Sequence, residues 1–312
     1  MNNSRLSRCG LFAAVVASAG LAGCGAPGTA PAYPPAVAAM QTQVVPEASR
    51  SFVFTCQNGT KSDCLVYTGH GKLLRTKTKD VLSPLGVAAG RDGLLYVANE
   101  FGDNILVYST AGRSLLRELG NGGNVPIDVA VFNDELAVSN EHALTFFLAG
   151  ATKPTRTLKD PNVLQGNGAA FDSNGNCYWS YASQTDGSAV DEFVRCKGKP
   201  KNLHIAPGSP YGIAFDRKGN LYYTSFSSEA NGVYRCSGTT SCRLVYNQFV
   251  DPEYLNFSRD FKDLWINDPG NISVGGAMYE IDVRTGKVVE TITGNLSFFN
   301  PPSGVAAAPG PF

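Results

Sequence analysis

A short segment recurs along the chain, and its successive copies start 40 to 50 residues apart. Each copy combines an apolar run, a polar turn and a second apolar run, as in PYGIAFDRKGNLYYTS from Pro210. Full copies start at Pro84, Pro126, Gly166, Pro210 and Pro252, and a shortened copy starts at Pro302. A repeat of this length made of short apolar strands is typical of β-propeller blades. The sequence therefore predicts an all-β fold.

Each repeat can be divided into four strands, a to d. In the copy at Pro210, GIAFD is strand a, DRKG is a turn and NLYYTS is strand b. Strand c has the pattern of NILVYSTAG from Asn104, and SLLREL is strand d. Asp216 then lies in the turn between strands a and b, where a carboxylate accepts hydrogen bonds from the following amides and glycine takes the left-handed conformation. We therefore expect Asp216 to be structural.

The two ends of the folded region complement each other. Residues 303–308 supply a strand a with no blade of its own, whereas SFVFTC from Ser51 and DCLVYTGHGKLLRTKT from Asp63 supply strands b, c and d. Pairing the two ends completes a blade and hides edge strands that would otherwise invite aggregation. The sequence predicts a six-bladed β-propeller over residues 51–312, with four antiparallel strands in each blade and a ring closed by its N- and C-terminal strands.

The N-terminal residues have the pattern of an export signal. Arg5 and Arg8 precede the apolar stretch LFAAVVASAGLAGC, which is too short to span a bilayer with ordinary flanks. Its last four residues, Leu21 to Cys24, resemble the lipobox of bacterial lipoproteins. That resemblance implies cleavage before Cys24 and a lipid on the Cys24 thiol. The alternative is ordinary cleavage near Ala19, which would leave Cys24 a free thiol.

Three regions follow from this pattern. Residues 1–23 are predicted to be a lipoprotein signal peptide, and residues 51–312 the propeller domain. Residues 24–50 are rich in Pro, Ala and Gly with almost no charge, so they cannot bury enough surface to fold alone and are predicted to form a tether. The lipoprotein resemblance implies export to the bacterial cell envelope, on its periplasmic or outer-membrane face, with the membrane contacted through the lipid on Cys24.

Charge excludes one class of partner. The chain has 26 basic and 26 acidic residues and no basic stripe of the kind that neutralises phosphates. We therefore expect no nucleic-acid partner. Separately, we expect the protein to be a monomer.

Six cysteines remain once Cys9 and Cys24 are set aside, an even number for an exported chain. Their places on neighbouring antiparallel strands, which bring α-carbons within bridging distance, suggest three bridges within blades. These are Cys56–Cys64, Cys177–Cys196 and Cys236–Cys242. Other pairings are possible, and for some of these residues the alternative is a buried free thiol. No pair has C-x-x-C spacing, so a zinc site is not expected.

The full motif, P-x-G-[IV]-A-x-D-x-x-G-N-L-Y followed by N-x-[IL]-V-Y, resembles NHL-type repeats and the related six-bladed gluconolactonase-like propellers. The resemblance covers nearly all of residues 52–312. It implies that the entrance of the central channel is lined by the first residues of strand a and by the ends of strand b with the loops that follow. The candidate binding residues at these positions are Asn99, Glu100, Asn140, Glu141, Asn167, Tyr211, Glu253, Asn267 and Asp268. The alternative is that their Asn and Asp side chains only cap their own loops.

The gluconolactonase-like relatives bind a divalent metal through Glu, Asn and Asp side chains at such positions. Asn167 could match this pattern, but Tyr211 stands where the relatives would place an aspartate. The chain has no G-x-S-x-G motif, and its three histidines fall in different blades. The predicted function is therefore a non-catalytic binding scaffold for a small ligand or an envelope protein, with no catalytic residue. The alternative is a metal-dependent lactonase or esterase that uses Glu253, Asn167 and carboxylates at the rim of the channel.

No cofactor or metal is predicted. The segment DSNGN from Asp172 superficially resembles a calcium loop, but it supplies one carboxylate where several are needed. Its equivalents in other copies, such as DRKGN, have the pattern of a turn. A turn is therefore expected there, with Ca²⁺ as the alternative.

Overall fold

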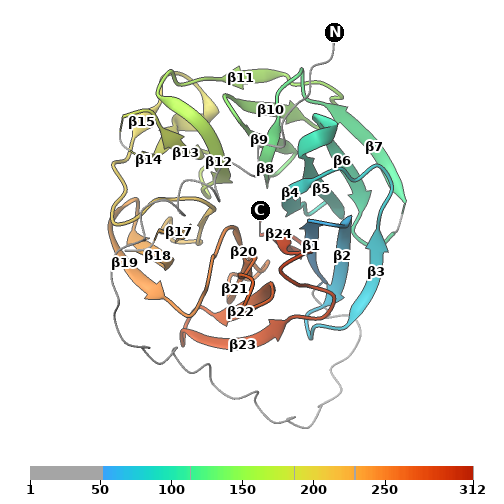
Figure 1. Cartoon of the computed structure of the whole chain (residues 1–312). Coiled ribbons are helices and arrows are strands. Elements are labelled where there is room, and N and C mark those ends of the chain that lie inside the picture. Colours follow the sequence, from blue (N-terminus) through green and yellow to red (C-terminus); the bar gives the residue numbers. More distant parts are fainter. Residues whose placement is uncertain (1–51, 113, 186, 228–229, 312) are drawn as a thin grey trace, which may run out of the picture. The chain divides into compact units, whose positions relative to one another are not determined.

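The computed structural model describes residues 52–112, 114–185, 187–227 and 230–311. They form six four-stranded antiparallel sheets arranged as blades in a ring (Figure 1). The six-bladed propeller predicted from the repeats is confirmed. The predicted signal peptide, the lipidated Cys24 and the tether lie outside the described residues, so they stay predictions. No helix in the described part of the chain is long and apolar enough to cross a membrane.

Each blade is named by its order in the chain, with strands a to d running from the channel to the rim. Blade 1 contains β24 (Pro302–Ala308), β1 (Phe52–Asn58), β2 (Ser62–Thr68) and β3 (Leu73–Lys77). Blade 2 contains β4 (Pro84–Ala89), β5 (Leu94–Asn99), β6 (Asn104–Ser109) and β7 (Leu115–Gly120). Blade 3 contains β8 (Pro126–Phe132), β9 (Glu135–Asn140), β10 (Leu144–Leu148) and β11 (Arg156–Leu158).

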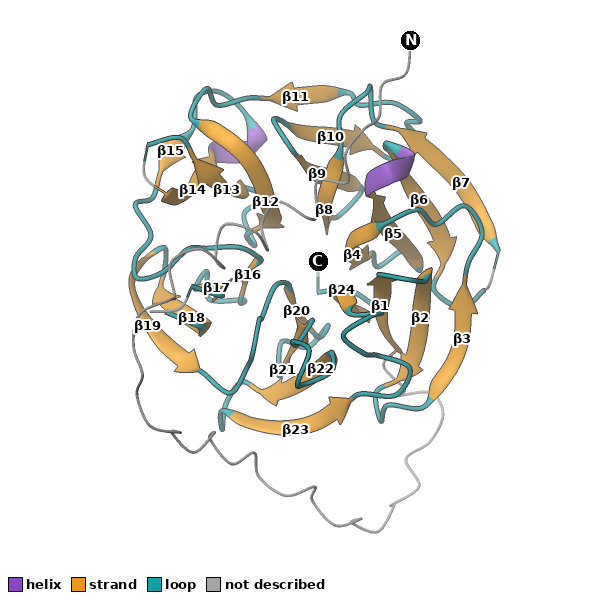
Figure 2. Cartoon of the chain, in the orientation of Figure 1, coloured by secondary structure: helices purple, strands orange, loops and turns teal. Residues whose placement is uncertain are grey.

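The second half of the ring repeats this order. Blade 4 contains β12 (Val163–Phe171), β13 (Cys177–Ser183), β14 (Gly187–Phe193) and β15 (Lys201–Asn202). Blade 5 contains β16 (Ile213–Phe215), β17 (Leu221–Ser225), β18 (Gly232–Ser237) and β19 (Thr240–Tyr246). Blade 6 contains β20 (Leu255–Phe257), β21 (Asp263–Asp268), β22 (Ala277–Asp282) and β23 (Lys287–Ile292). Two short 3-10 helices, Glu100–Gly102 and Val194–Cys196, are the helical turns among the described residues (Figure 2).

The ring is closed by the two ends of the described chain. β24 pairs antiparallel with β1, so that Phe52 lies opposite Ala308 and Phe54 opposite Ala306. Both Phe54 and Ala306 are fully buried in the cluster that blade 1 shares with blade 2. The predicted closure of the sixth blade is therefore confirmed.

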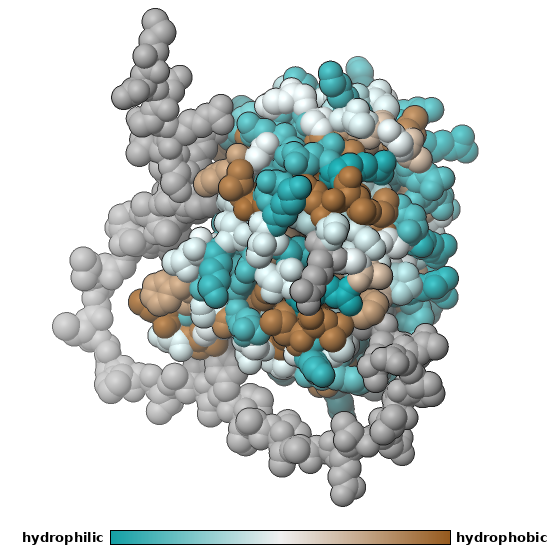
Figure 3. All heavy atoms as spheres, turned by 90° about the vertical axis from the view of Figure 1, so that its right-hand side faces the viewer, coloured by the Kyte–Doolittle hydropathy of each residue, from teal (hydrophilic) through white to brown (hydrophobic). Residues whose placement is uncertain are grey.

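Burial explains why the inner strands are more apolar than the outer ones. β6 has the pattern NILVYS and is buried on both of its faces, because blades stack against each other on either side. β7 and β23 lie at the rim, and most of their residues are exposed or half-buried. Figure 3 shows the ring from the side, where hydrophilic side chains cover much of the surface with apolar groups exposed among them. Apolar patterning is therefore a weaker signal for strand d.

Antiparallel strands divide the connections between two faces of the ring. The a–b and c–d turns form the turn face, which comprises residues 69–72, 90–93, 110–112, 133–134, 149–155, 172–176, 194–200, 216–220, 238–239, 258–262 and 283–286. The b–c loops and d–a connections form the loop face, which comprises residues 59–61, 78–83, 100–103, 121–125, 141–143, 159–162, 184–185, 203–212, 226–227, 230–231, 247–254, 269–276 and 293–301. Strand β1 begins and strand β24 ends at the turn face.

The turn role of Asp216 is confirmed. Its Oδ1 accepts hydrogen bonds from the backbone N–H of Lys218 (2.8 Å) and Asn220 (2.9 Å). Asp172 does the same in blade 4, accepting from the N–H groups of Asn174 and Asn176, both at 2.9 Å. The DSNGN carboxylate therefore stabilises its own hairpin, as the turn interpretation predicts.

Two of the three predicted disulfides are present, Cys56–Cys64 and Cys236–Cys242. In both, the cysteines are direct partners across neighbouring strands. The third prediction is wrong in this structure, because Cys177 and Cys196 are free, buried thiols.

Register explains the difference. The cross-strand partner of Cys177 is Phe193, three positions before Cys196. Arg195 and Cys196 then turn through the left-handed conformation, with φ of 50° and 53°. The Cys196 thiol lies 3.6 Å from the carbonyl oxygen of Gly175. The two thiols are still near neighbours, since Cys196 adds to the effect of burial in raising the pKa of Cys177.

The structure predicts two free thiols among the six cysteines of the propeller. Alkylation of the unreduced, denatured protein followed by peptide mass spectrometry should label Cys177 and Cys196 and leave the other four unlabelled. Protein without any label at these two positions, together with a linked peptide that joins them, would show that the third bridge forms.

Candidate functional site

The six inner strands surround a narrow central channel whose walls are crowded. In four blades the third residue of the P-x-G motif is glycine, at Gly86, Gly168, Gly212 and Gly304. A Cβ at Gly168 would lie 2.6 Å from the carbonyl oxygen of Tyr211 in the next blade, and one at Gly304 would lie 2.6 Å from that of Leu85. Real Cβ atoms do not approach so closely. The glycine of the repeat is therefore required by the contact between neighbouring inner strands.

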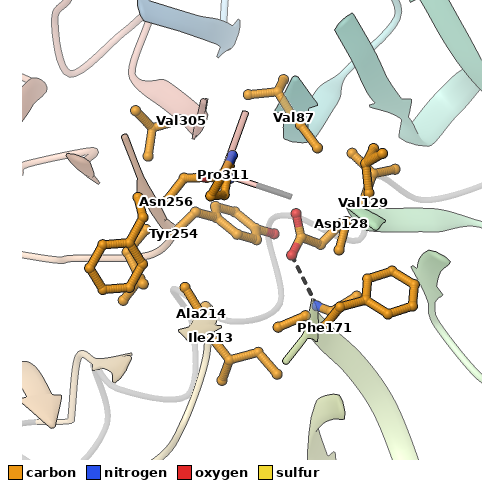
Figure 4. A pocket seen from close by; sticks show the side chains of 18 of the residues that line it. Val87, Asp128, Val129, Phe171, Ile213, Ala214, Tyr254, Asn256, Val305 and Pro311 are labelled. Atoms are coloured by element: carbon orange, nitrogen blue, oxygen red, sulfur yellow. Dashed lines mark hydrogen bonds between the residues drawn. The ribbon is translucent and has the colours of Figure 1, made fainter. Parts of the chain in front are cut away.

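Two blades carry a side chain at this position, Asp128 in blade 3 and Tyr254 in blade 6. Figure 4 shows the Tyr254 hydroxyl and the Asp128 carboxylate turned toward each other in the channel. The Tyr254 hydroxyl lies 3.5 Å from the carbonyl oxygen of Ile127 and 3.5 Å from the hydroxyl of Tyr211. Asp128 Oδ2 accepts a hydrogen bond from the N–H of Ala169 in blade 4, at 3.0 Å. Aligning the copies of the repeat would have exposed both residues, because they replace its glycine.

Asp128 is a buried carboxyl without a cation among its described partners. Burial raises its pKa to about 7, although the backbone N–H groups of Ala169 and Val129 oppose that rise. Burial also raises the pKa of Tyr254 well above its usual range, and Asp128 adds to this effect. Asp128 is therefore poised to change its charge near neutral pH.

The channel is small. The pocket among the inner strands has a cavity volume of about 50 Å³, which is enough for a few water molecules but not for a metabolite. Its lining includes Phe171, Phe215 and Phe257, from the ends of three inner strands, and Pro311 near the end of the chain (Figure 4). A ligand of metabolite size therefore does not fit in this pocket.

Four of the predicted binding residues are used by the fold itself. The side chain of Asn99 accepts from the N–H of Leu82 (2.6 Å) and donates to the carbonyl oxygen of Asp80 (3.1 Å). Asn140 donates to Thr145 Oγ1 at 2.9 Å and accepts from the side chain of Asn121. Both amides are fully buried and hold the connection that leads into their own blade.

Asn267 and Asp268 have the same role in blade 6. Asn267 accepts from the N–H of Tyr254 (2.7 Å) and donates to the carbonyl oxygen of Pro302 (3.0 Å), which ties blade 6 to blade 1. The carboxylate of Asp268 accepts from the N–H groups of Val250 (2.8 Å) and Asp251 (2.9 Å). The loop-capping alternative is thus observed for all four strand-b residues.

Glu100 and Glu141 lie in the loops that follow β5 and β9. Glu100 is buried, and its carboxylate accepts a hydrogen bond from Ser83 Oγ at 2.8 Å. Burial raises the pKa of Glu100, and the nearby Glu141 adds to this effect. Glu141 is half-buried and lies 3.8 Å from Nε2 of His142.

Asn167 is buried in β12 and makes no side-chain hydrogen bond with another described residue.

The remaining candidates, Tyr211 and Glu253, lie where the channel opens onto the loop face. The ring of Tyr211 makes edge contacts with Tyr254, at 5.3 Å between centroids, and with the exposed Phe226, at 5.2 Å. Glu253 immediately precedes Tyr254, and Asp251 lies two residues earlier. We call Tyr211, Phe226, Asp251 and Glu253 the mouth.

The two carboxyl groups of the mouth, Asp251 and Glu253, have no basic partner among the described residues. Burial raises the pKa of Glu253 to about 8, and Asp251 and Asp268 add to the rise, while Asn267 opposes it. Burial and Asp268 raise the pKa of Asp251 to about 6. Within the described part of the chain, no group of three or more His, Cys, Asp or Glu side chains is placed to hold a metal ion.

No protein-family model matches the sequence, and no curated protein matches it. Among solved structures, a chain in the crystal structure of a nidogen/laminin complex is similar to this one, with a TM-score of 0.68. The similarity covers 83% of this chain and 98% of that chain, at 14% sequence identity. At this identity the likeness concerns the fold alone, and it supports the propeller. The resemblance to NHL-type repeats stays a prediction.

The raised pKa of Asp128 predicts a pH dependence of stability. A carboxyl with a folded-state pKa of about 7 and an ordinary value near 3.8 keeps its proton longer in the folded state. The contribution of Asp128 to the free energy of unfolding is therefore most favourable at low pH, and it is lost as the pH rises toward 7. Between pH 5 and pH 8, the free energy of unfolding of the wild type should fall by on the order of 2 kcal/mol more than that of Asp128→Asn.

Urea denaturation at the two pH values measures this difference. Asp134→Asn, which changes an exposed carboxylate on the turn face, is the matched control and should follow the wild type. An identical pH dependence in the wild type and in Asp128→Asn would contradict the assignment.

Proposed function

We propose that this chain is a non-catalytic binding scaffold that takes a positively charged group of a partner at its mouth. One observation carries the proposal. The aromatic rings of the mouth lie beside Asp251 and Glu253, and no described cation pairs with these two carboxyl groups. The pKa of Glu253 is raised by burial and by other carboxylates, so a bound cation would lower it and be stabilised in turn. Aromatic rings such as Tyr211 and Phe226 add cation–π attraction to such a site.

The surroundings of the mouth favour a protein partner. The described loop-face segments contain seven acidic residues, among them Glu100 and Glu141, and three basic ones, Lys61, Lys79 and Lys159. Large apolar side chains are exposed on the same face, including Phe101 and Ile272. An acidic rim around exposed aromatic groups suits a partner with basic and apolar side chains.

Two further considerations support the proposal. The similar solved chain comes from a complex of nidogen and laminin, so a propeller of this kind occurs there within a protein–protein complex. The pocket among the inner strands is too small for a metabolite, which favours binding at a face of the ring.

We also propose that the scaffold is held at the bacterial cell envelope by a lipid on Cys24, as the lipobox-like sequence predicts. No observation favours the metal-dependent lactonase alternative over this function. Asn167 and Glu253 lie in blades 4 and 6, and in the described residues Glu253 belongs to no group of three or more His, Cys, Asp or Glu side chains placed to hold a metal.

Binding of charged peptides tests the proposal. Calorimetric titration should show that the purified protein binds an arginine-rich peptide and not a glutamate-rich peptide of the same length. Glu253→Gln and Tyr211→Leu should each weaken this binding by about tenfold, because each removes a contact worth roughly 1 kcal/mol or more. The variant Asp134→Asn, with the same loss of charge at an exposed position, should bind as the wild type does.

Equal binding by the wild type and both mouth variants would contradict the proposal, as would no binding of either peptide. A stoichiometric divalent metal in the dialysed protein, with EDTA-sensitive hydrolysis of a lactone, would establish the hydrolase alternative instead.

A further inference from the structure

The turn face is strongly basic although the whole chain has no net charge and its sequence has no basic stripe, because the basic residues come from turns far apart in the sequence. Its described turns contain eleven basic residues, and every one of them is exposed. Three lie in 194–200, two each in 216–220 and 258–262, and one each in 69–72, 90–93, 149–155 and 283–286. The same turns contain five acidic residues, of which Asp172 and Asp216 are turned inward to cap their hairpins. The two faces of the ring therefore have opposite charge.

Few of these cations are neutralised within the protein. Of the eleven, Lys262 pairs with a described carboxylate, with its Nζ 2.7 Å from Asp260. Arg91 and Arg217 donate instead to carbonyl oxygens, those of Pro311 and Arg259. In the described residues no ion pair is formed by Arg195, Lys197, Lys199 or Lys218. A face with this excess of free positive charge attracts an anionic surface.

The described chain enters the propeller on the turn face. Phe52, where the described chain begins, lies opposite Ala308 at the turn-face end of β1. Any segment that links the propeller to an anchor at Cys24 must therefore join it on the basic face. The acidic mouth opens on the opposite face.

We propose that the turn face docks on the anionic headgroups of the membrane to which the chain is tethered, which leaves the mouth facing away from the bilayer. The orientation rests on the proposed lipid anchor, whereas the affinity of the turn face for anionic lipid does not depend on it. Basic side chains close to an anionic bilayer are attracted to its headgroups, and this attraction fades within about a Debye length. A lipid chain and a basic patch together hold a protein more firmly than either does alone.

Vesicle co-sedimentation tests the docking without the lipid. The ring is closed by its own strands, so a chain that begins at Gly25 keeps every element of the propeller. It should bind vesicles made of equal parts phosphatidylglycerol and phosphatidylcholine, and it should not bind vesicles of phosphatidylcholine alone. Raising the salt concentration to about 1 M should abolish the binding, because the Debye length falls to about 3 Å.

Two triple variants with the same change in net charge separate the faces. Lys197→Glu, Lys199→Glu and Lys218→Glu together should weaken vesicle binding at least about tenfold. Lys61→Glu, Lys79→Glu and Lys159→Glu together, on the loop face, should leave it nearly unchanged. Equal loss in both variants, no binding of wild type to anionic vesicles, or binding to a soluble sulfated polysaccharide but not to vesicles would each overturn the proposal.

The anchor is tested separately in cells. The full chain should stay in the membrane fraction after a high-salt wash, whereas Cys24→Ala should be released by that wash. Retention of Cys24→Ala through high salt would contradict the anchor, and with it the orientation, while the vesicle result would still report on the turn face.

Discussion

The pairing of β24 with β1 is the interaction on which the rest of this structure depends. It brings together residues about 250 positions apart in sequence and completes a blade that neither end of the chain can form alone. Closing the ring covers the two sheet edges that an open array of blades would expose. It also brings the inner strands so close together that a side chain at the third motif position meets the next blade, which explains the repeated glycine.

The polar residues of the loop face fall into two groups. The side chains at the ends of strand b form hydrogen bonds that hold the connection leading into their own blade, as those of Asn99, Asn267 and Asp268 do. Side chains at the start of strand a, such as Tyr211 and Glu253, lie where the channel opens. Asp128 and Tyr254 place a carboxylate and a hydroxyl in the otherwise mostly apolar channel because they replace glycine (Figure 4). The proposed binding groups of the mouth therefore belong to blades 5 and 6 and their connection, and Asp128 lies inside the channel.

The repeats carried nearly all of the information about the fold, because strand order, blade number and ring closure follow from the alignment of the copies. The turn role of Asp216 followed from its equivalents for the same reason. The repeats could not show which polar side chains already have partners, so the strand-b amides were indistinguishable from Tyr211 and Glu253. They also could not show that Arg195 and Cys196 leave the strand in a left-handed conformation, which separates Cys196 from the register of Cys177. Asp128 and Tyr254 were missed although the alignment contained their signal.

The antiparallel strand order of each blade separates the acidic loops from the basic turns, and closure of the ring joins the six blades so that each kind of connection gathers on one face. Hydrogen exchange of the intact chain, followed by mass spectrometry of peptides from residues 302–308 and from β4 and β8, tests that closure most directly. The amides of β24 should exchange as slowly as those of the other inner strands, because all are buried and paired. Exchange of β24 at the rate of an unprotected tail, while β4 and β8 stay protected, would contradict the closed ring.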